Sequence, residues 1–105
     1  MRRGEIWWAD LPPPAGHRPV VLLSRDEAYV NRELVTVAPV SQRIRGIRAE
    51  VPLGPEDGLP RSCAVNLDSM TTVPKDALQR YISSLNIEKL REVGSAIHFA
   101  LGLER

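Results

Sequence analysis

A proline-rich loop followed at once by an unbroken apolar run leaves this chain few ways to fold. Residues 12–16 read Pro-Pro-Pro-Ala-Gly, and residues 19–24 read Pro-Val-Val-Leu-Leu-Ser. Three consecutive prolines cannot serve a sheet ladder, so residues 12–16 must form a loop. The run from Val20 to Leu23 predicts a strand that is buried on both faces or curved around a small core.

Other short strands are predicted on either side of this one. Residues 5–11, 35–41, 47–53, 62–67 and 69–73 are bounded by turn residues and carry aromatic, β-branched or alternating apolar side chains. Residues 42–46 are predicted to form a basic hairpin loop, and residues 26–32 a polar segment that connects two strands. Five or six short antiparallel strands indicate a mainly β fold, a small curved barrel.

After Pro74 the chain is predicted to turn helical. Apolar residues spaced by three and four positions form a stripe from Ile87 through Leu90, Gly94 and Ile97 to Leu101. Asn86 or Ser84 is expected to cap the start of this helix, and Gly102 its end. With 105 residues, barrel and helix are expected to form one domain, residues 1–105.

Composition indicates a globular cytoplasmic protein. Hydrophobic residues make up 43% of the chain and charged residues 26%, and no apolar stretch is long enough for a membrane span or a secretory signal. The one cysteine, Cys63, excludes an intramolecular disulfide and cannot form a structural zinc site alone. No P-loop, dinucleotide fingerprint or zinc-ligand spacing is present, so we expect no metal and no cofactor.

The net charge of +1 conceals an uneven distribution. Residues 11–25 and 34–49 contain no acid but hold five arginines, and twelve of the fourteen basic residues are arginine. Arginine makes planar, bidentate contacts with phosphate that lysine cannot. Genome composition alone is one explanation of this bias. The placement of the charge favours a polyanionic partner.

Two side chains at strand ends suggest a phosphodiester site. Arg18 stands at the mouth of the buried strand, where a rigid backbone would hold its guanidinium as a phosphate receptor. Ser41 ends the strand over residues 35–41 and offers a hydroxyl to phosphate or ribose. The alternatives are a surface salt bridge from Arg18 to Asp10 or Glu5, and a turn-forming role for Ser41.

His17 is a candidate for proton transfer, because histidine titrates near physiological pH. Successive strand residues face opposite sides, however, so His17 should point away from a site that holds Arg18 unless the turn rotates it. By the same rule one of Trp7 and Trp8 belongs to the core, and the other lies at an edge or interface. Base stacking by an exposed tryptophan is the alternative.

The chain resembles the MazF/PemK toxins of bacterial toxin–antitoxin systems over nearly its whole length. The opening Arg3-Gly4-Glu5-Ile6-Trp7-Trp8-Ala9-Asp10-Leu11 and the Gly-x-Arg-Pro-Val-Val pattern of residues 16–21 are its most specific features. Ala-Pro-Val-Ser at 38–41, the block at 64–73 and the C-terminal helix support it.

The resemblance implies an SH3-like barrel that forms a homodimer. It also implies a metal-independent endoribonuclease that cuts single-stranded RNA, chiefly mRNA, at short motifs and is neutralised by a segment of a cognate antitoxin. Family catalysis would fall to Arg18 and Ser41, by attack of the ribose 2′-hydroxyl to leave a 2′,3′-cyclic phosphate and a 5′-hydroxyl. The RNA-binding candidates are Gln42, Arg43, Arg45, Arg48 and Asp68.

Two departures from the family pattern stand out. The first loop has prolines where many relatives carry an acidic or amide residue, and Ser41 replaces the common threonine. A guanidinium is also a poor general base at neutral pH, which suits Arg18 to stabilising charge rather than moving a proton. Competing interpretations are a non-catalytic gyrase binder of the same fold, similar to CcdB, and a plain nucleic-acid or peptide-binding module.

Overall fold

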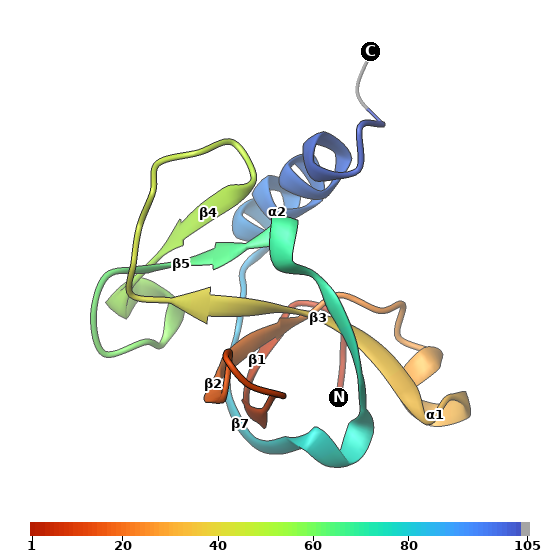
Figure 1. Cartoon of the computed structure of the whole chain (residues 1–105). Helices are drawn as coiled ribbons and strands as arrows, with labels where there is room; N and C mark the ends of the chain where they lie inside the picture. Colours follow the sequence, from red (N-terminus) through yellow and green to blue (C-terminus); the bar gives the residue numbers. More distant parts are fainter. Residues whose placement is uncertain (104–105) are drawn as a thin grey trace.

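The computed structural model describes residues 1–103, which form an antiparallel sheet of seven strands with a long C-terminal helix (Figure 1). The strands are β1 (Glu5–Asp10), β2 (His17–Leu22), β3 (Leu34–Ser41), β4 (Glu50–Leu53), β5 (Cys63–Asn66), β6 (Thr71–Pro74) and β7 (Leu78–Ser84). The helices are α1 (Ala28–Asn31), α2 (Ile87–Ala100) and the short 3-10 turns η1 (Pro55–Asp57), η2 (Leu67–Ser69) and η3 (Lys75–Ala77). The predicted mainly β fold with a C-terminal helix is confirmed.

The sheet is curved and open rather than closed. Its strands follow the order β4-β5-β3-β2-β1-β7, and β6 pairs with β3 outside this path. Residues 34–37 of β3 pair with β6, whereas residues 40–41 pair with β5. The long strand β3 thus links two smaller sheets, which cross in Figure 1.

Strand β2 is buried on both faces, as its apolar run predicts. Val21 belongs to the core cluster covered by α2, which also holds Ile6, Val93 and Ala96. Val20 and Leu22 belong to a second cluster beneath α1. The side chains of Val20, Val21 and Leu22 are all 0% exposed. Because these residues pack into both clusters, β2 is held firmly, and Arg18 lies near the start of this strand.

The helix α2 forms as predicted, but it buries a different stripe. Asn86 caps it, since its Oδ1 accepts a hydrogen bond from the Lys89 N–H at 2.8 Å. Val93 and Ala96 are its buried residues, whereas Ile87 and Leu101, the ends of the predicted stripe, are exposed. Of the predicted stripe, Leu90 and Ile97 are half-buried and Ile97 packs against the core, so the prediction was wrong at the two helix ends only.

The strand count of five or six was too low because β7 was missed. Its burial pattern shows little alternation, with residues 79–81 exposed in succession. Its pairing with β1 shifts register twice, between Ile6 and Trp7 and between Trp8 and Ala9. A strand interrupted in this way lacks the period of two from which strands are recognised in a sequence.

The loop after β3 is not a hairpin. Strand β5 lies between β3 and β4 and is antiparallel to both, so residues 42–49 cross over from β3 to the far side of β5. The crossover is held by Glu50, whose Oε1 accepts hydrogen bonds from the N–H groups of Arg45 and Gly46 at 2.9 and 3.0 Å. The basic residues of the loop are therefore carried on a fixed backbone.

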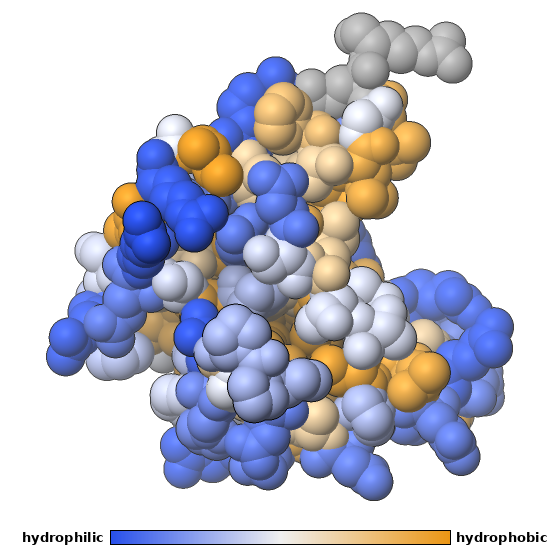
Figure 2. Space-filling model, in the orientation of Figure 1, coloured by the Kyte–Doolittle hydropathy of each residue, from blue (hydrophilic) through white to orange (hydrophobic). Residues whose placement is uncertain are grey.

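Apolar side chains gather near the C-terminal end of α2 in Figure 2. Phe99, Leu101 and Leu103 of that segment are exposed. No helix within residues 1–103 is long and apolar enough to cross a membrane.

Candidate active site

Arg18 is held at the start of β2 by the loop before it. It pairs with Ala9 of β1, and its Nε donates a hydrogen bond to the carbonyl oxygen of Ala15 at 2.6 Å. The side chain is half-buried. The alternative, a salt bridge from Arg18 to Asp10 or Glu5, is absent from the ion pairs of the described residues, and Asp10 binds His17 instead.

Ser41 lies opposite Arg18. Strands β2 and β3 pair Leu22 with Val37 and Val20 with Pro39, and the same register two residues further places Ser41 across from Arg18. The Ser41 Oγ accepts a hydrogen bond from the Arg43 N–H at 3.1 Å, which leaves its own proton available for another acceptor. The structure therefore brings the predicted arginine and hydroxyl together.

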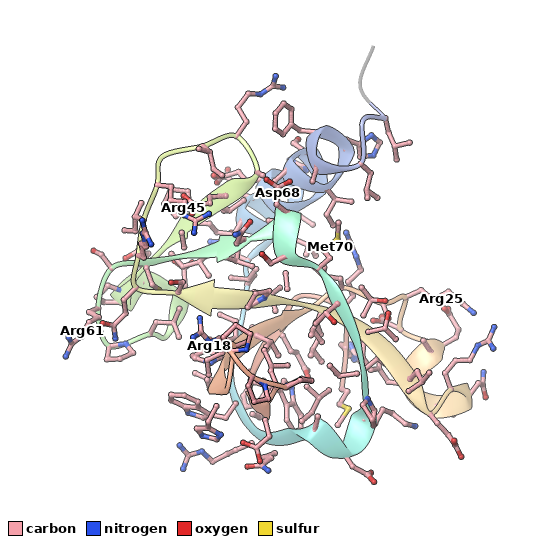
Figure 3. The ribbon with its side chains drawn as sticks, in the orientation of Figure 1. Arg18, Arg25, Arg45, Arg61, Asp68 and Met70 are labelled. Atoms are coloured by element: carbon pink, nitrogen blue, oxygen red, sulfur yellow. The ribbon has the colours of Figure 1, made fainter. Side chains whose placement is uncertain are left out.

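Both residues line a groove of about 520 Å³. One wall is apolar and comes from the loop between β1 and β2, with Leu11, the three prolines and Ala15. The other wall is polar and carries Arg45, Asn66, Ser69 and Thr71. In Figure 3, Arg18 lies beside β3 and Arg45 lies on the crossover loop. A groove with a cationic floor and one apolar wall suits a phosphate with its base or sugar alongside.

Sequence reasoning missed three residues of the polar wall: Asn66, Ser69 and Thr71. They come from β5, η2 and the start of β6, where the chain crosses from one small sheet to the other. The Asn66 amide donates to Ser69 Oγ at 3.2 Å and accepts from the Asp68 N–H at 2.9 Å. Polar residues at a strand end are ordinary turn formers, so nothing in their types sets them apart.

A second hollow, of about 370 Å³, shares Arg18 and Ser41 with the groove. It is also lined by Trp8, His17, Pro19, Val40, Gln42 and Arg43. His17 thus lies beside Arg18 at the strand end, although the two residues are on opposite faces of β2. His17 does not line the groove, but it lines this second hollow together with Arg18 and Ser41.

The two tryptophans separate as predicted. Trp7 packs against the cluster beneath α1, lies edge-on to Tyr81 with ring centroids 6.2 Å apart, and donates a hydrogen bond to Glu5. Trp8 faces the other side of β1 and lines the second hollow. It also lines an adjoining apolar pocket of about 300 Å³ with Leu59, Cys63 and Ile82.

The remaining candidates divide between the site and the rest of the surface. Gln42 and Arg43 line the second hollow, and Arg45 lines the groove. Arg48 instead lies over the ring of Phe99, with its guanidinium carbon 4.3 Å from the ring centroid, in a hollow against α2. Asp68 is exposed on η2, and Figure 3 shows it toward α2, away from Arg18.

No group of three or more His, Cys, Asp or Glu side chains in residues 1–103 is arranged to hold a metal ion. Cys63 is buried, and burial raises the pKa of its thiol, as do the nearby carboxylates of Asp57 and Glu56. Its Sγ donates to the Leu53 carbonyl at 3.7 Å. The thiol therefore acts as a core side chain.

Fold and site together define a small antiparallel β protein with an arginine–hydroxyl pair suited to a phosphodiester. Comparison with known proteins identifies the family within this class. The model of the PemK-like, MazF-like toxins of type II toxin–antitoxin systems matches residues 2–101. The chain belongs to this family.

Individual relatives agree with that assignment. A protein of Mycobacterium tuberculosis named probable endoribonuclease MazF5 is 39% identical, with 98% of this chain and 94% of the relative aligned. The solved M. tuberculosis toxin MazF-mt6 superposes with a TM-score of 0.88 at 32% identity, covering 96% of this chain and 99% of the toxin. A mycobacterial endoribonuclease solved with its cognate antitoxin has a TM-score of 0.89 at 27% identity, covering 100% and 98%.

Proposed function

We propose that this toxin is an endoribonuclease in which Arg18 and Ser41 act on the scissile phosphate of single-stranded RNA. The reaction is attack of the ribose 2′-hydroxyl on the adjacent phosphorus, without a metal ion, to give a 2′,3′-cyclic phosphate and a 5′-hydroxyl. The observation that carries the proposal is that Arg18 and Ser41 together line the groove and the second hollow. The endoribonuclease names of the relatives support it.

Arg18 is suited to stabilise the charge that develops on the phosphorane oxygens. Its Nε is bound to Ala15, and its two terminal nitrogens have no partner among residues 1–103. A guanidinium fixed in this way needs little reorganisation to meet a phosphate. A preorganised donor of this kind contributes about 3–4 kcal/mol to lowering a barrier.

Ser41 orients the phosphate. Because its oxygen already accepts from Arg43, its proton is directed to a different acceptor, and a phosphate oxygen in the groove fits that requirement. His17 is our candidate for the proton transfer that a guanidinium performs poorly.

The RNA backbone contacts the polar and basic residues that line the groove and the second hollow. Gln42, Arg43 and Arg45 are the contacts we propose for the phosphate backbone, while Arg48 and Asp68 contribute less because they lie outside these hollows. The apolar wall of prolines gives the groove a surface for a base or sugar without a charged group.

The proposed partners are a second copy of the chain and a cognate antitoxin. An antitoxin segment that occupies the same groove would block RNA by competition, and the mycobacterial relative solved with its antitoxin supports such a partner. We expect the toxin domain, residues 1–105, to act in the cytoplasm, where mRNA is available.

The decisive experiment incubates the purified protein with a long unstructured RNA in EDTA and maps the new ends. Cleavage with cyclic-phosphate and 5′-hydroxyl ends, and no cleavage of the all-deoxy strand, is the expected result. Arg18→Ala and Ser41→Ala should abolish or strongly reduce cutting while the melting temperature stays near that of the parent. Undiminished cleavage by Arg18→Ala would reject the assignment.

A further inference from the structure

The His17 imidazole is clamped by two side chains of β1, Asp10 and Trp8, and Gln79 of β7 holds Asp10 in turn. Its Nδ1 lies 2.7 Å from Asp10 Oδ1, and its ring stacks on Trp8 with centroids 5.0 Å apart and planes 2° from parallel. The other carboxylate oxygen of Asp10, Oδ2, accepts a hydrogen bond from Gln79 Nε2 at 2.5 Å. The clamp thus runs from β2 through β1 to β7.

The sheet register explains how the clamp forms. Strands β1 and β2 pair Asp10 with His17 and Trp8 with Pro19, so Trp8, Asp10 and His17 share one face of the sheet. Trp8 and Asp10 are two positions apart, which puts the indole under the ring and the carboxylate beside it. The bulged edge strand β7 then supplies Gln79 to the outer oxygen of Asp10.

The contacts of the clamp contribute little to the stability of the fold. The side chains of His17 and Asp10 are 54% and 57% exposed, and an ion pair this open to solvent contributes little to folding. The same exposure leaves the imidazole edge accessible in the hollow that holds Arg18 and Ser41. The clamp orients a ring that a ligand can reach.

We infer that Asp10 is a positioning residue that holds His17 as the acceptor of the 2′-hydroxyl proton. This inference rests on the proposed RNA cleavage. An ionised carboxylate only accepts hydrogen bonds, so the neutral ring must carry its proton on Nδ1 and keep its lone pair on Nε2. Within residues 1–103 the bond to Asp10 is the hydrogen bond recorded for this ring, so Nε2 is left for substrate.

His17 Nε2 takes the proton of the 2′-hydroxyl while O2′ forms a bond to phosphorus. The bond from phosphorus to O5′ breaks, and O5′ takes a proton from a water molecule. The hydroxide so formed removes the proton from the imidazolium, which returns to its starting tautomer. Arg18 and Ser41 hold the phosphate oxygens throughout and gain or lose no proton.

The test compares the cleavage rates of His17→Gln and Asp10→Asn with that of the parent on one RNA. We expect His17→Gln to lose at least about a hundredfold in rate. Asp10→Asn should lose about tenfold or more, because an amide can also donate to Nδ1 and no longer fixes the tautomer. His98→Gln on α2 and Asp76→Asn on η3 are matched controls that should retain the parental rate. Melting curves show whether each variant is folded.

A substrate with sulfur in place of O5′ decides the direction of proton transfer. A thiolate leaves without a proton, so a variant that lacks only a general acid would regain its rate on this substrate. His17→Gln should stay slow on it, and full rescue would overturn the assignment. Parental rates for both variants, with Arg18→Ala inactive, would reject the clamp and leave the ribonuclease intact. A parent that cuts no RNA would reject the ribonuclease itself.

Discussion

The Oγ of Ser83 donates a hydrogen bond of 2.5 Å to the backbone carbonyl of Asp57. Ser83 lies on β7, one end of the sheet path, and Asp57 lies in η1, directly after β4 at the other end. The sheet does not close by strand pairing, so this contact joins its two ends. It requires close approach at the next residue, Gly58.

Gly58→Ala should lower the free energy of unfolding by roughly 2–3 kcal/mol. Gly58 has a φ of +88°, and a Cβ there would lie 2.5 Å from the Cβ of Ser83. The substitution therefore combines a left-handed backbone with a clash against a strand that cannot move freely. Urea unfolding followed by circular dichroism measures the loss. A variant as stable as the parent would show that the ends of the sheet are not coupled here.

Gly94→Ala should instead raise the free energy of unfolding. Gly94 lies inside α2, and a Cβ at that position would meet no atom within 4 Å. Alanine reduces the freedom of the unfolded chain and favours the helix, so we expect about 0.5–1 kcal/mol of added stability. The same urea titration measures it. Destabilisation would mean that the surface of α2 at this residue is covered by something that the side chain displaces.

The Cys63 thiol should react slowly with a disulfide reagent in the folded protein. Burial and the carboxylates of Asp57 and Glu56 raise its pKa, so less thiolate is present at a given pH than in an exposed cysteine. Reaction should accelerate on unfolding in urea to the rate of a free thiol. Fast modification of the native protein at pH 7 would contradict the buried position.

Arg45 and Arg48 should differ in their contribution to RNA binding. Arg45 lines the groove, whereas Arg48 lies over Phe99 against α2. With a 2′-O-methyl RNA that cannot be cut, Arg45→Gln should weaken binding by about three- to tenfold at 0.1 M salt and reduce the salt slope by roughly 0.7. Arg48→Gln should change affinity and slope much less. Equal losses of affinity for the two variants would indicate that RNA also contacts the surface around Arg48 and α2.

The sequence was sufficient for the local features near the site. The buried strand over residues 20–22 followed from four consecutive apolar residues, and the Arg18 and Ser41 pairing followed from two strands that end in polar side chains. Both depend on patterns within a few residues. The antiparallel register of β2 and β3 then brings the ends of the two strands close together.

What the sequence did not reveal depends on contacts between distant segments. Strand β7 owes its place to β1 rather than to its own pattern, and Gln79 reaches Asp10 across 69 residues of chain. Asn66 and Thr71 enter the groove because β3 changes partners from β6 to β5 along its length. His17 lines the second hollow with Arg18 although it is the next residue along the strand, which alternation along a strand does not describe.

The double burial of β2 sets the conditions under which the site can be lost. Val20, Val21 and Leu22 contribute to both cores, so their amides should exchange with solvent only when the whole domain unfolds. Arg18 begins the same strand and stays in place for as long as that protection lasts. Loosening of the C-terminal helix alone would therefore leave Arg18 and Ser41 on their strands. An occupant of the groove would block such a site without unfolding it, and removal of that occupant would restore a site that needs no refolding.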